Sequence, residues 1–477
     1  MREYNVCLIN DSFPPEIDGV ANAVTNYARI INQGYGRATV VTPDHPQADD
    51  SVFPFPVLRY PSIDMTKYVG YRAGMPFSPE IQKKLEGGGF ELIHSHCPIT
   101  STLLARALRY KLDVPVVFTY HTKFDIDIAN AINSKLMQEE AKKLLVGNIA
   151  ACDEVWTVSR GAGENLRKLG YEGGYIVMPN GVDLQRGRVS DELVRSVTAD
   201  YDLPAGVPMF LFVGRIMWYK GLRIILDALK MLKDSGQDFR MVFVGAGTDK
   251  DAVVACRDQL GLGDKVFFSP PIHDREQIRA WYCRADMFLF PSTFDTNGLV
   301  VREAAACALG SVLIEGSCAA EDVTDGQNGC LINENASSMF NLLAKLCKNM
   351  ETVKAIGANA QRDLYMSWDQ SVANACQRYG AVIDNFKRGL YHESGGLSEE
   401  LCRAAAQAMD AINRSRDKQK IRRDELKTGY DELKDGLKAN YSGLLGLKDE
   451  LKGGIQEGQE RIRDKLEDLS QRLDRFL

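Results

Sequence analysis

The feature that most constrains the fold is an alternation of short apolar runs with longer amphipathic stretches, which occurs in two series along the chain. This alternation is typical of parallel α/β sheets, in which each buried strand is followed by a covering helix. The expected strands of the first series are Val6–Ile9, Ala38–Thr42, Leu92–His94, Val114–Tyr120, Glu154–Ser159 and Ile176–Met178. Those of the second series are Met209–Gly214, Met241–Gly245, Val266–Ser269, Met287–Phe290 and Val312–Ile314.

A polar stretch from residue 183 to residue 204 separates the two series and marks a domain boundary. With 477 residues, the chain is also too long for a single core. We therefore predict two doubly wound, Rossmann-like domains, residues 1–200 and 201–368, and expect a helix over 369–390 to cross back onto the first domain. Ligands of open parallel sheets bind at the carboxyl ends of the strands, so two facing domains predict a shared cleft.

Residues 397–477 form a different kind of sequence, which is rich in charge, free of proline and helix-favouring. Apolar residues from Leu426 to Phe476 recur mostly at steps of three and four, which places them on one face of a helix. Glycines interrupt this pattern, each at a cost of about 1 kcal/mol in helix propensity. They argue against a long rigid coiled coil and favour a helical hairpin that folds onto the body or mediates self-association.

The composition limits the class and the compartment. A formal net charge of -6 argues against a nucleic-acid-binding protein, which would usually be basic. The 11 cysteines are odd in number and include no CxxC pair, so we expect reduced thiols. The first residues lack a signal-peptide core, and no apolar run reaches the roughly 18 residues of a membrane-spanning helix. We therefore expect a cytoplasmic protein whose membrane contact is peripheral, on the inner face of the cell membrane.

The most informative segment runs from Phe290 to Ala304, where the sequence predicts a strand end, a polar loop and a helix that begins near Gly298. Unpaired backbone N–H groups at such a helix start form an anion site suited to a diphosphate. Glu303 lies about one turn inside this helix, where its carboxylate can accept hydrogen bonds from two vicinal sugar hydroxyls. Asp295 lies on the preceding loop. The alternative is that both acids only cap and solvate a surface helix.

Two further loops carry the residue types of a phosphate site. Arg215 and Lys220 follow the first strand of the second series and stand between Gly214 and Gly221, which makes them a candidate phosphate clamp. In the first series Gly19 follows the first strand, where it would let the backbone approach a phosphate closely. The dinucleotide fingerprint GxGxxG is missing from that turn, which counts against a dehydrogenase.

These motifs follow one another in a specific order. From the N-terminus they are Pro14-Pro15, Asp18-Gly19-Val20, His94-Ser95-His96, Thr119-Tyr120-His121-Thr122, Pro179-Asn180-Gly181-Val182-Asp183, Gly214-Arg215, Lys220-Gly221, Asp295 and Glu303. The combination resembles glycosyltransferase family 4 over roughly residues 4–390. The resemblance implies the two-domain GT-B fold, a nucleotide-sugar donor, no metal or cofactor, and hexosyl transfer with retention of the anomeric configuration.

The sequence departs from the family pattern at one acidic position. The family has two glutamates separated by seven residues, whereas the first acid here is Asp295, whose carboxylate reaches one methylene less far. Together with Thr119-Tyr120-His121-Thr122, this departure resembles the branch that glucosylates diacylglycerol and related membrane lipids. The resemblance therefore implies UDP-glucose as the first donor to consider and a lipid acceptor at the membrane surface.

Carried over by motif, Arg215 and Lys220 would neutralise the donor diphosphate, and Glu303 would hold the ribose hydroxyls. Breaking the anomeric bond develops negative charge on the leaving diphosphate, which these cations and the helix dipole would stabilise by several kcal/mol. We favour attack on the face from which the diphosphate departs, with a phosphate oxygen taking the acceptor proton. A double displacement by a side-chain nucleophile is the alternative route.

The resemblance implies further roles around the reacting sugar. Asp295, with the backbone of Asn297–Leu299, would bind the transferred sugar and the diphosphate. His121 would lie beside the sugar from the first domain, and Gly19 would lie against the diphosphate. Asn180-Gly181 is expected to shape the cleft rather than to perform chemistry. Catalytic roles are thus expected for His121, Asp295, Arg215 and Lys220.

Histidines and cysteines also invite a metal-site interpretation. His94 and His96 alternate along one strand and Cys97 follows, but no third and fourth ligand stands at a recognisable spacing. We therefore predict no metal site and assign the two histidines a structural place at the strand end. Three further cysteines are interpreted as small apolar core residues: Cys307, Cys318 and Cys330.

Two segments are candidates for membrane contact. The first is a predicted amphipathic surface made of Lys135, Leu136, Met137, Lys142, Lys143, Leu144 and Leu145. The second is a cluster of six cations between Arg414 and Arg423, each of which would attract anionic headgroups by about 1 kcal/mol. Because acids are interspersed with these cations, a solvated helix with intrahelical ion pairs is the alternative.

Other functions remain open at this point. A polysaccharide or a small glycan is the alternative acceptor. A nucleotide-sugar epimerase shares the two-domain plan, but it would turn over the donor without an acceptor. The alternative outside enzymes is a sugar-nucleotide-binding scaffold whose helical tail recruits partners; the intact set of Arg215, Lys220 and Glu303 argues against it.

Overall fold

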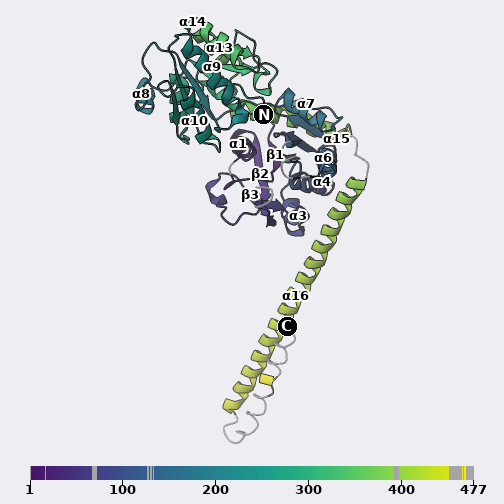
Figure 1. The fold of residues 1–477 in the computed structure, drawn as a ribbon. Helices are drawn as coiled ribbons and strands as arrows, with labels where there is room; N and C mark the ends of the chain where they lie inside the picture. Colours follow the sequence, from purple (N-terminus) through teal and green to yellow (C-terminus); the bar gives the residue numbers. More distant parts are fainter. Residues whose placement is uncertain are drawn as a thin grey trace. The chain divides into compact units, whose positions relative to one another are not determined.

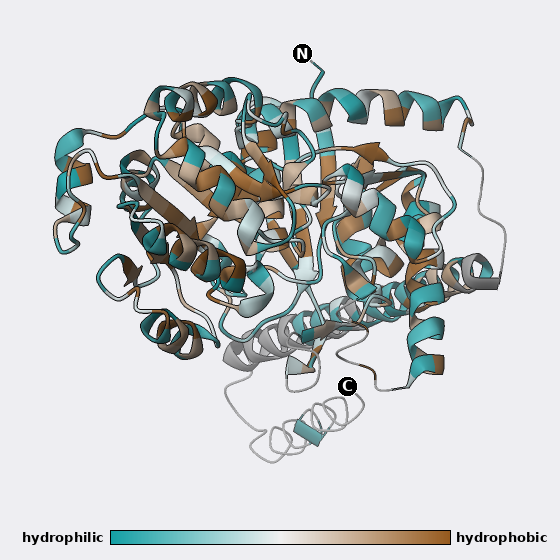
Figure 2. Ribbon diagram, turned by 45° about the horizontal axis from the view of Figure 1, so that its top comes forward, coloured by the Kyte–Doolittle hydropathy of each residue, from teal (hydrophilic) through white to brown (hydrophobic). Residues whose placement is uncertain are grey.

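The computed structural model describes residues 2–16, 18–66, 72–125, 128, 132, 134–391, 397–450, 465, 467 and 468. The chain divides into two compact units, residues 1–409 and 410–477. The first unit contains two parallel sheets, each covered by helices (Figure 1). In Figure 2 apolar strands lie inside and the helices turn hydrophilic faces outward. This arrangement confirms the predicted pair of Rossmann-like domains.

The first sheet has 7 strands in the order β3-β2-β1-β6-β7-β8-β9. These are β1 (Tyr4–Ile9), β2 (Gly36–Pro43), β3 (Val57–Tyr60), β6 (Leu92–Ser95), β7 (Val116–Tyr120), β8 (Glu154–Thr157) and β9 (Ile176–Val177). The accompanying elements are α1 (Gly19–Gly34), η1 (Asp50–Val52), α3 (Pro79–Glu86), α4 (Thr100–Leu112), α6 (Lys135–Ala150), α7 (Arg160–Lys168) and an antiparallel pair, β4 (Ser62–Asp64) with β5 (Arg72–Gly74). Val6 of β1 pairs with Ala38 of β2 and Leu92 of β6, so β1 lies at the centre of the core.

The second sheet has 6 strands in the order β12-β11-β10-β13-β14-β15. These are β10 (Met209–Val213), β11 (Arg240–Val244), β12 (Val266–Ser269), β13 (Met287–Phe290), β14 (Gly310–Ile314) and β15 (Cys330–Ile332). Its helices are α8 (Asp191–Thr198), η2 (Trp218–Lys220), α9 (Leu222–Asp234), α10 (Lys250–Gln259), α11 (Arg275–Arg284), α12 (Leu299–Ala306), η3 (Cys318–Ala320), α13 (Ala336–Leu346) and α14 (Met350–Asp363). The side chains of β10, β11 and β13 form one buried core with α9 and α13.

The structure adds two edge strands that the hydrophobic pattern does not predict, β3 and β15. Both are short, and each pairs with one neighbour only, through β2 and β14 respectively. Three of the four residues of β3 are only half-buried, so its composition lacks the continuous apolar run that marks a central strand.

Helix α15 (Trp368–Lys387) follows the second sheet in sequence but packs in the core of the first. Its buried face includes Tyr379, whose ring stacks on Trp156 of β8 at a centroid distance of 5.5 Å. The Tyr379 hydroxyl lies 2.6 Å from His94 Nδ1 of β6. Arg378 on the same helix pairs with Glu154 of β8. The chain thus crosses between the two sheets twice, once before α8 and once at α15.

Helix α16 (Leu397–Glu450) is one helix of 54 residues. Its first part belongs to the first unit, where Ala406 and Met409 pack against Ala107 of α4. The helix continues through Gly436, so the expectation that glycines interrupt the tail is wrong up to residue 450. A glycine weakens a helix without breaking it. The second arm of the expected hairpin lies mostly outside the described residues.

The amphipathic surface that the sequence predicts on α6 is wrong at Leu145. It is 8% exposed and packs in the core with Phe118 and Ile149, because it faces the sheet. Leu136 and Leu144 are each 75% exposed. Among the described residues, no helix is both long and apolar enough to cross a membrane.

Candidate active site

Each sheet has a topological switch point beside its first strand. β1 lies between β2 and β6, and β10 lies between β11 and β13. The loops that leave the carboxyl ends of such neighbouring strands run to opposite sides and open a crevice for ligands. Lys220 follows β10 and Asp295 follows β13, so the crevice of the second sheet is where these two predicted residues meet.

Lys220 and Asp295 form an ion pair at this crevice. The ammonium Nζ of Lys220 lies 2.7 Å from Oδ1 and 2.8 Å from Oδ2 of Asp295. Ser292 donates a further hydrogen bond to Oδ2 at 2.6 Å. Lys220 is only 7% exposed, and its ammonium lies over the rings of Tyr219 and Phe290. The pair is therefore a cation and a carboxylate held together in a largely water-excluded setting.

Glycines allow the two loops to approach each other. Gly221 has φ 76° and caps the start of α9. A side chain at this position would collide with the backbone carbonyl of Pro291, on the loop that carries Asp295. Gly221 thus permits the close packing that brings Lys220 to Asp295.

The start of α12 is open as an anion site. Its N-cap is Gly298, with φ 57°, and no side chain caps the first turn. Leu299, the first helical residue, is half-buried. The first amides of a helix lack intrahelical partners and carry the positive end of the helix dipole. This free helix start lies next in sequence to the Lys220–Asp295 pair, where a diphosphate would meet a cation and backbone donors together.

Glu303 projects from the second turn of α12. Its Oε2 accepts a hydrogen bond from the Tyr282 hydroxyl at 3.0 Å, and the side chain is 15% exposed. Burial raises the pKa of Glu303, whereas the Tyr282 hydrogen bond and Arg275 act in the opposite direction. The carboxylate is thus partly shielded from water and keeps one oxygen turned away from Tyr282.

Arg215 is placed differently from Lys220. It follows Gly214 at the end of β10, is exposed, and makes no hydrogen bond or ion pair with other residues that the structure describes. A free guanidinium on this loop is available to a ligand phosphate. The two cations therefore differ in state, because one is paired and buried and the other is open.

His121 closes the end of β7 and is 8% exposed. Burial lowers its pKa to about 3, so the imidazole is neutral at physiological pH. Its Nε2 lies 3.0 Å from His96 Nδ1. Both ring nitrogens of His94 are engaged, with Tyr379 and with Thr119. The His96 contact orients His121, and the two contacts of His94 leave that residue no nitrogen for a metal.

Gly19 is the first residue of α1, and a side chain there would meet no atom within 4 Å. Asp18 caps this helix, accepting from the amides of Val20 and Ala21 at 2.7 Å each. At α1 the protein's own carboxylate thus occupies the position that is open at α12. The expected contact of Gly19 with a diphosphate stays a prediction.

Three residues join the two domains at the edge of the crevice. The Asn297 amide, oriented by its partners, donates to Val158 O at 3.1 Å and accepts from Asn180 N at 3.2 Å. Ser159 donates to Thr296 O at 2.5 Å. Lys123 Nζ donates to Thr293 O at 3.3 Å. Lys123 was not predicted as a site residue. Its position two residues beyond His121 is the one feature of the sequence that could have indicated it.

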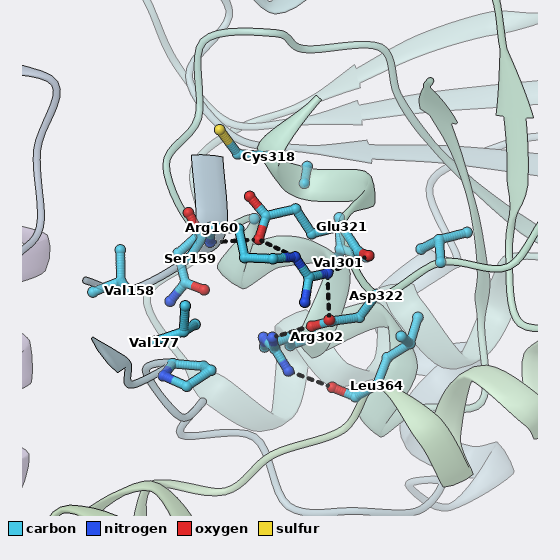
Figure 3. Close-up of a pocket in the computed structure, with 15 residues that line it drawn as sticks. Val158, Ser159, Arg160, Val177, Val301, Arg302, Cys318, Glu321, Asp322 and Leu364 are labelled. Atoms are coloured by element: carbon cyan, nitrogen blue, oxygen red, sulfur yellow. Dashed lines mark hydrogen bonds and ion pairs between the residues drawn. The ribbon is translucent and has the colours of Figure 1, made fainter. Parts of the chain in front are cut away.

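Beside these contacts lies a small pocket (Figure 3). Glu321 of the second domain accepts from the backbone amides of Arg160, at 2.7 Å, and Gly161, at the start of α7. Asp322 lies between Arg160 and Arg302, at 3.4 and 3.0 Å. The pocket reaches Asn297 and Gly298 at the start of α12, but it does not include the Lys220–Asp295 pair or Glu303. We therefore interpret it as the seam between the domains, which borders the proposed diphosphate site at α12.

Replacing Glu321 by alanine is expected to lower the free energy of unfolding by about 1–2 kcal/mol, because two amides at the start of α7 lose their acceptor. Denaturant unfolding followed by fluorescence measures this change. Glu315→Ala, which removes an exposed acid that precedes Glu321 in the sequence, is the matched control. Equal stability of the two variants would mean that Glu321 does not hold the seam.

Two family models match the chain. The model described as glycosyl transferases group 1 matches residues 197–363, and that described as Glycosyltransferase Family 4 matches residues 17–186. Together they cover both domains. The chain belongs to glycosyltransferase family 4. Its enzyme class is accordingly that of a glycosyltransferase, and the loops described above lie within the two matched regions.

Relatives of this glycosyltransferase carry different substrate names. A D-inositol 3-phosphate glycosyltransferase of Xylanimonas cellulosilytica is 27% identical over 304 residues, covering 60% of this chain and 70% of that protein. The alpha-monoglucosyldiacylglycerol synthase of Acholeplasma laidlawii is 22% identical over 398 residues, covering 80% and 98%. Among solved structures, Anabaena Alr3699/HepE in complex with UDP has a TM-score of 0.64 at 17% identity, covering 80% and 100%. That likeness shows that the fold is GT-B.

Proposed function

We propose that this glycosyltransferase moves a hexose, glucose first among the candidates, from a nucleoside diphosphate sugar to a membrane lipid such as diacylglycerol. The observation that carries the donor half of the proposal is the Lys220–Asp295 pair beside the open start of α12. A diphosphate placed there would face an ammonium group and free backbone amides, and Asp295 would face the sugar. The UDP-bound relative with the same fold supports this reading.

The geometry favours transfer on one face of the sugar, with retention and without a metal. Lys220 binds both oxygens of Asp295, which makes that carboxylate a poor nucleophile. Lys220, Arg215 and the α12 dipole would supply the positive charge that the leaving diphosphate requires. The neutral imidazole of His121 would lie beside the sugar as a hydrogen-bonding group rather than as a cation. A phosphate oxygen of the leaving group would then accept the acceptor proton.

The Acholeplasma laidlawii relative, which covers 80% of this chain, supports the lipid acceptor, because its name contains diacylglycerol. Incubating UDP-glucose with diacylglycerol liposomes and analysing lipid extracts by mass spectrometry tests this half. The proposal predicts glucosylated lipid whose sugar is α-linked by NMR, formed equally with and without a chelator. A β-linked product would overturn retention, and donor turnover without any acceptor would indicate an epimerase.

A second acceptor class is favoured by the inositol-phosphate relatives. Their acceptor names describe a small, polar, phosphorylated polyol rather than a lipid. Offering D-inositol 3-phosphate and diacylglycerol liposomes in parallel separates the two classes. Product from the polyol alone would move this enzyme to the second class.

Membrane contact through α6 follows from the lipid acceptor. Leu136 and Leu144 are each 75% exposed, and each leucine side chain that enters a bilayer contributes about 1.5–3 kcal/mol. The double change Leu136→Gln and Leu144→Gln is therefore expected to weaken liposome binding at least about tenfold in flotation. Val52→Gln, which removes an apolar side chain that is 67% exposed, is the control. Unchanged flotation of the double variant would exclude α6 and leave the cations between Arg414 and Arg423 as the candidate.

A further inference from the structure

Glu303 has an ionic neighbour that the family motif does not contain. While its Oε2 accepts from Tyr282, its Oε1 faces Arg275, whose NH1 lies 3.7 Å away. Arg275 is the first residue of α11, and 54% of its side chain is exposed. The guanidinium therefore lies at the surface side of the carboxylate that is proposed to bind the donor ribose.

The second nitrogen of Arg275 reaches a residue of the connection between the domains. NH2 lies 3.1 Å from Oδ2 of Asp183. Asp183 in turn accepts from Asn22 at 3.3 Å and from Asn26 at 3.2 Å. These two asparagines stand one turn apart on α1, the helix that begins at Gly19. A continuous chain of contacts thus runs from Glu303 on α12 to α1 in the first domain.

We propose that Arg275 is a positioning residue of the donor site: it holds the Glu303 carboxylate and ties it, through Asp183, to helix α1. This inference rests on the proposed function, because Glu303 is taken there as the ribose-binding carboxylate. A forked guanidinium suits the role, since it engages two carboxylates at once, whereas an ammonium is a point charge. Donor binding at Glu303 is thereby coupled to the contact between the domains.

Without Arg275, the two carboxylates would face each other uncompensated. The charged and titratable groups around Glu303 are Arg275 and Tyr282 from α11 and Asp183 from the connection. Of these, Asp183 raises the pKa of Glu303, and Arg275 lowers it. Removing Arg275 therefore raises this pKa further, so Glu303 becomes protonated at a higher pH. An isolated exposed ion pair contributes little to stability, so the effect is expected in binding.

The test is calorimetric titration of UDP-glucose, without acceptor, across the acidic and neutral range. Arg275→Gln is expected to move the midpoint of the acid-side loss of affinity upward by about one pH unit. At a pH below both midpoints, this shift makes the affinity of the variant about tenfold weaker than that of the wild type. Arg275→Lys, which keeps the cation, should recover much of the shift. Asp183→Asn should weaken binding at a pH above the midpoint, through the lost hold on Arg275. Arg223→Gln, an exposed arginine paired with Asp227 on α9, is the matched control.

The outcomes separate this inference from the proposed function. Wild-type protein that binds no UDP-glucose would contradict the proposed donor. If the wild type binds but Arg275→Gln leaves the affinity unchanged, or lowers it equally at every pH, the positioning role is wrong. Thermal unfolding of Arg275→Gln close to that of the wild type shows that the readout reports the site and not the fold.

Discussion

Lys220→Ala is expected to lower kcat/KM by about 100- to 1000-fold. Two losses combine in this variant. The donor diphosphate loses a cation, and Asp295 loses the ammonium that binds both of its oxygens at 2.7 and 2.8 Å. Stability should fall as well, by less than the about 3–5 kcal/mol of a fully buried pair, because the Asp295 side chain that is left behind is 23% exposed. Steady-state kinetics and denaturant unfolding on the same preparation measure both effects.

The control for this change is Lys230→Ala, which removes the same side chain from an exposed pair with Asp234. It should leave both activity and stability nearly unchanged. Lys220→Arg keeps the charge and should retain more activity than Lys220→Ala. If Lys220→Ala lowered stability but not kcat/KM at permissive temperature, Lys220 would be a structural cation and not part of the diphosphate site.

Glu303→Ala is expected to weaken the binding of UDP-glucose by at least about 100-fold, because two hydrogen bonds to a charged acceptor are worth about 1.5–3 kcal/mol each. The carboxylate is placed by the Tyr282 hydroxyl at 3.0 Å and by α12 itself. Calorimetric titration measures the loss directly. Glu351→Ala, an exposed acid in the first turn of α14, is the matched control.

The pH dependence of binding follows from the same residue. Burial raises the pKa of Glu303 above its ordinary value. In the proposed function, ribose hydroxyls would donate to the ionised carboxylate, so affinity should be complete above this pKa and be lost as the pH falls through it. The loss should begin at a higher pH than for an ordinary glutamate. Glu303→Gln should abolish this acid-side loss of affinity. A loss that persists in the variant would assign the titration to another group.

The fold was largely predictable because central parallel strands are continuous apolar runs. The runs at Val6–Ile9 and Met287–Phe290, for example, lie inside or coincide with β1 and β13. The edge strand β15 is an apolar run of only 3 residues, too short to stand out as a strand, and was missed. In the tail the error was the reverse, because a helix that exists was underestimated. The low helix propensity of glycine was given too much weight, and α16 is continuous through its glycines up to residue 450.

The site was predictable where its chemistry is local in sequence. The polar loop, the glycine N-cap and Glu303 follow one another on one strand–loop–helix unit, so Gly298 could be placed from the sequence. Contacts between distant segments were not predictable. The pairing of Lys220 with Asp295 depends on the order of the strands in the sheet, and spacing alone does not reveal it.

Residues that join the two domains were the least predictable part of the site. Asn297 was expected to offer its backbone to the donor, whereas its side chain bridges Val158 and Asn180. Neither Lys123 nor Arg275 was assigned a role from the sequence. Only the placement of the first domain's loops against α11 and the β13 loop gives them partners.

We propose that this cleft transfers a hexose from a nucleoside diphosphate sugar to a lipid. The most direct measurement follows UDP release and glucosyl-diacylglycerol formation together, with UDP-glucose and diacylglycerol liposomes. We expect the two products to appear in equal amounts with the wild type and both to be lost in Glu303→Ala. UDP release without glycolipid would contradict the acceptor, and equal rates in the wild type and Glu303→Ala would contradict the site.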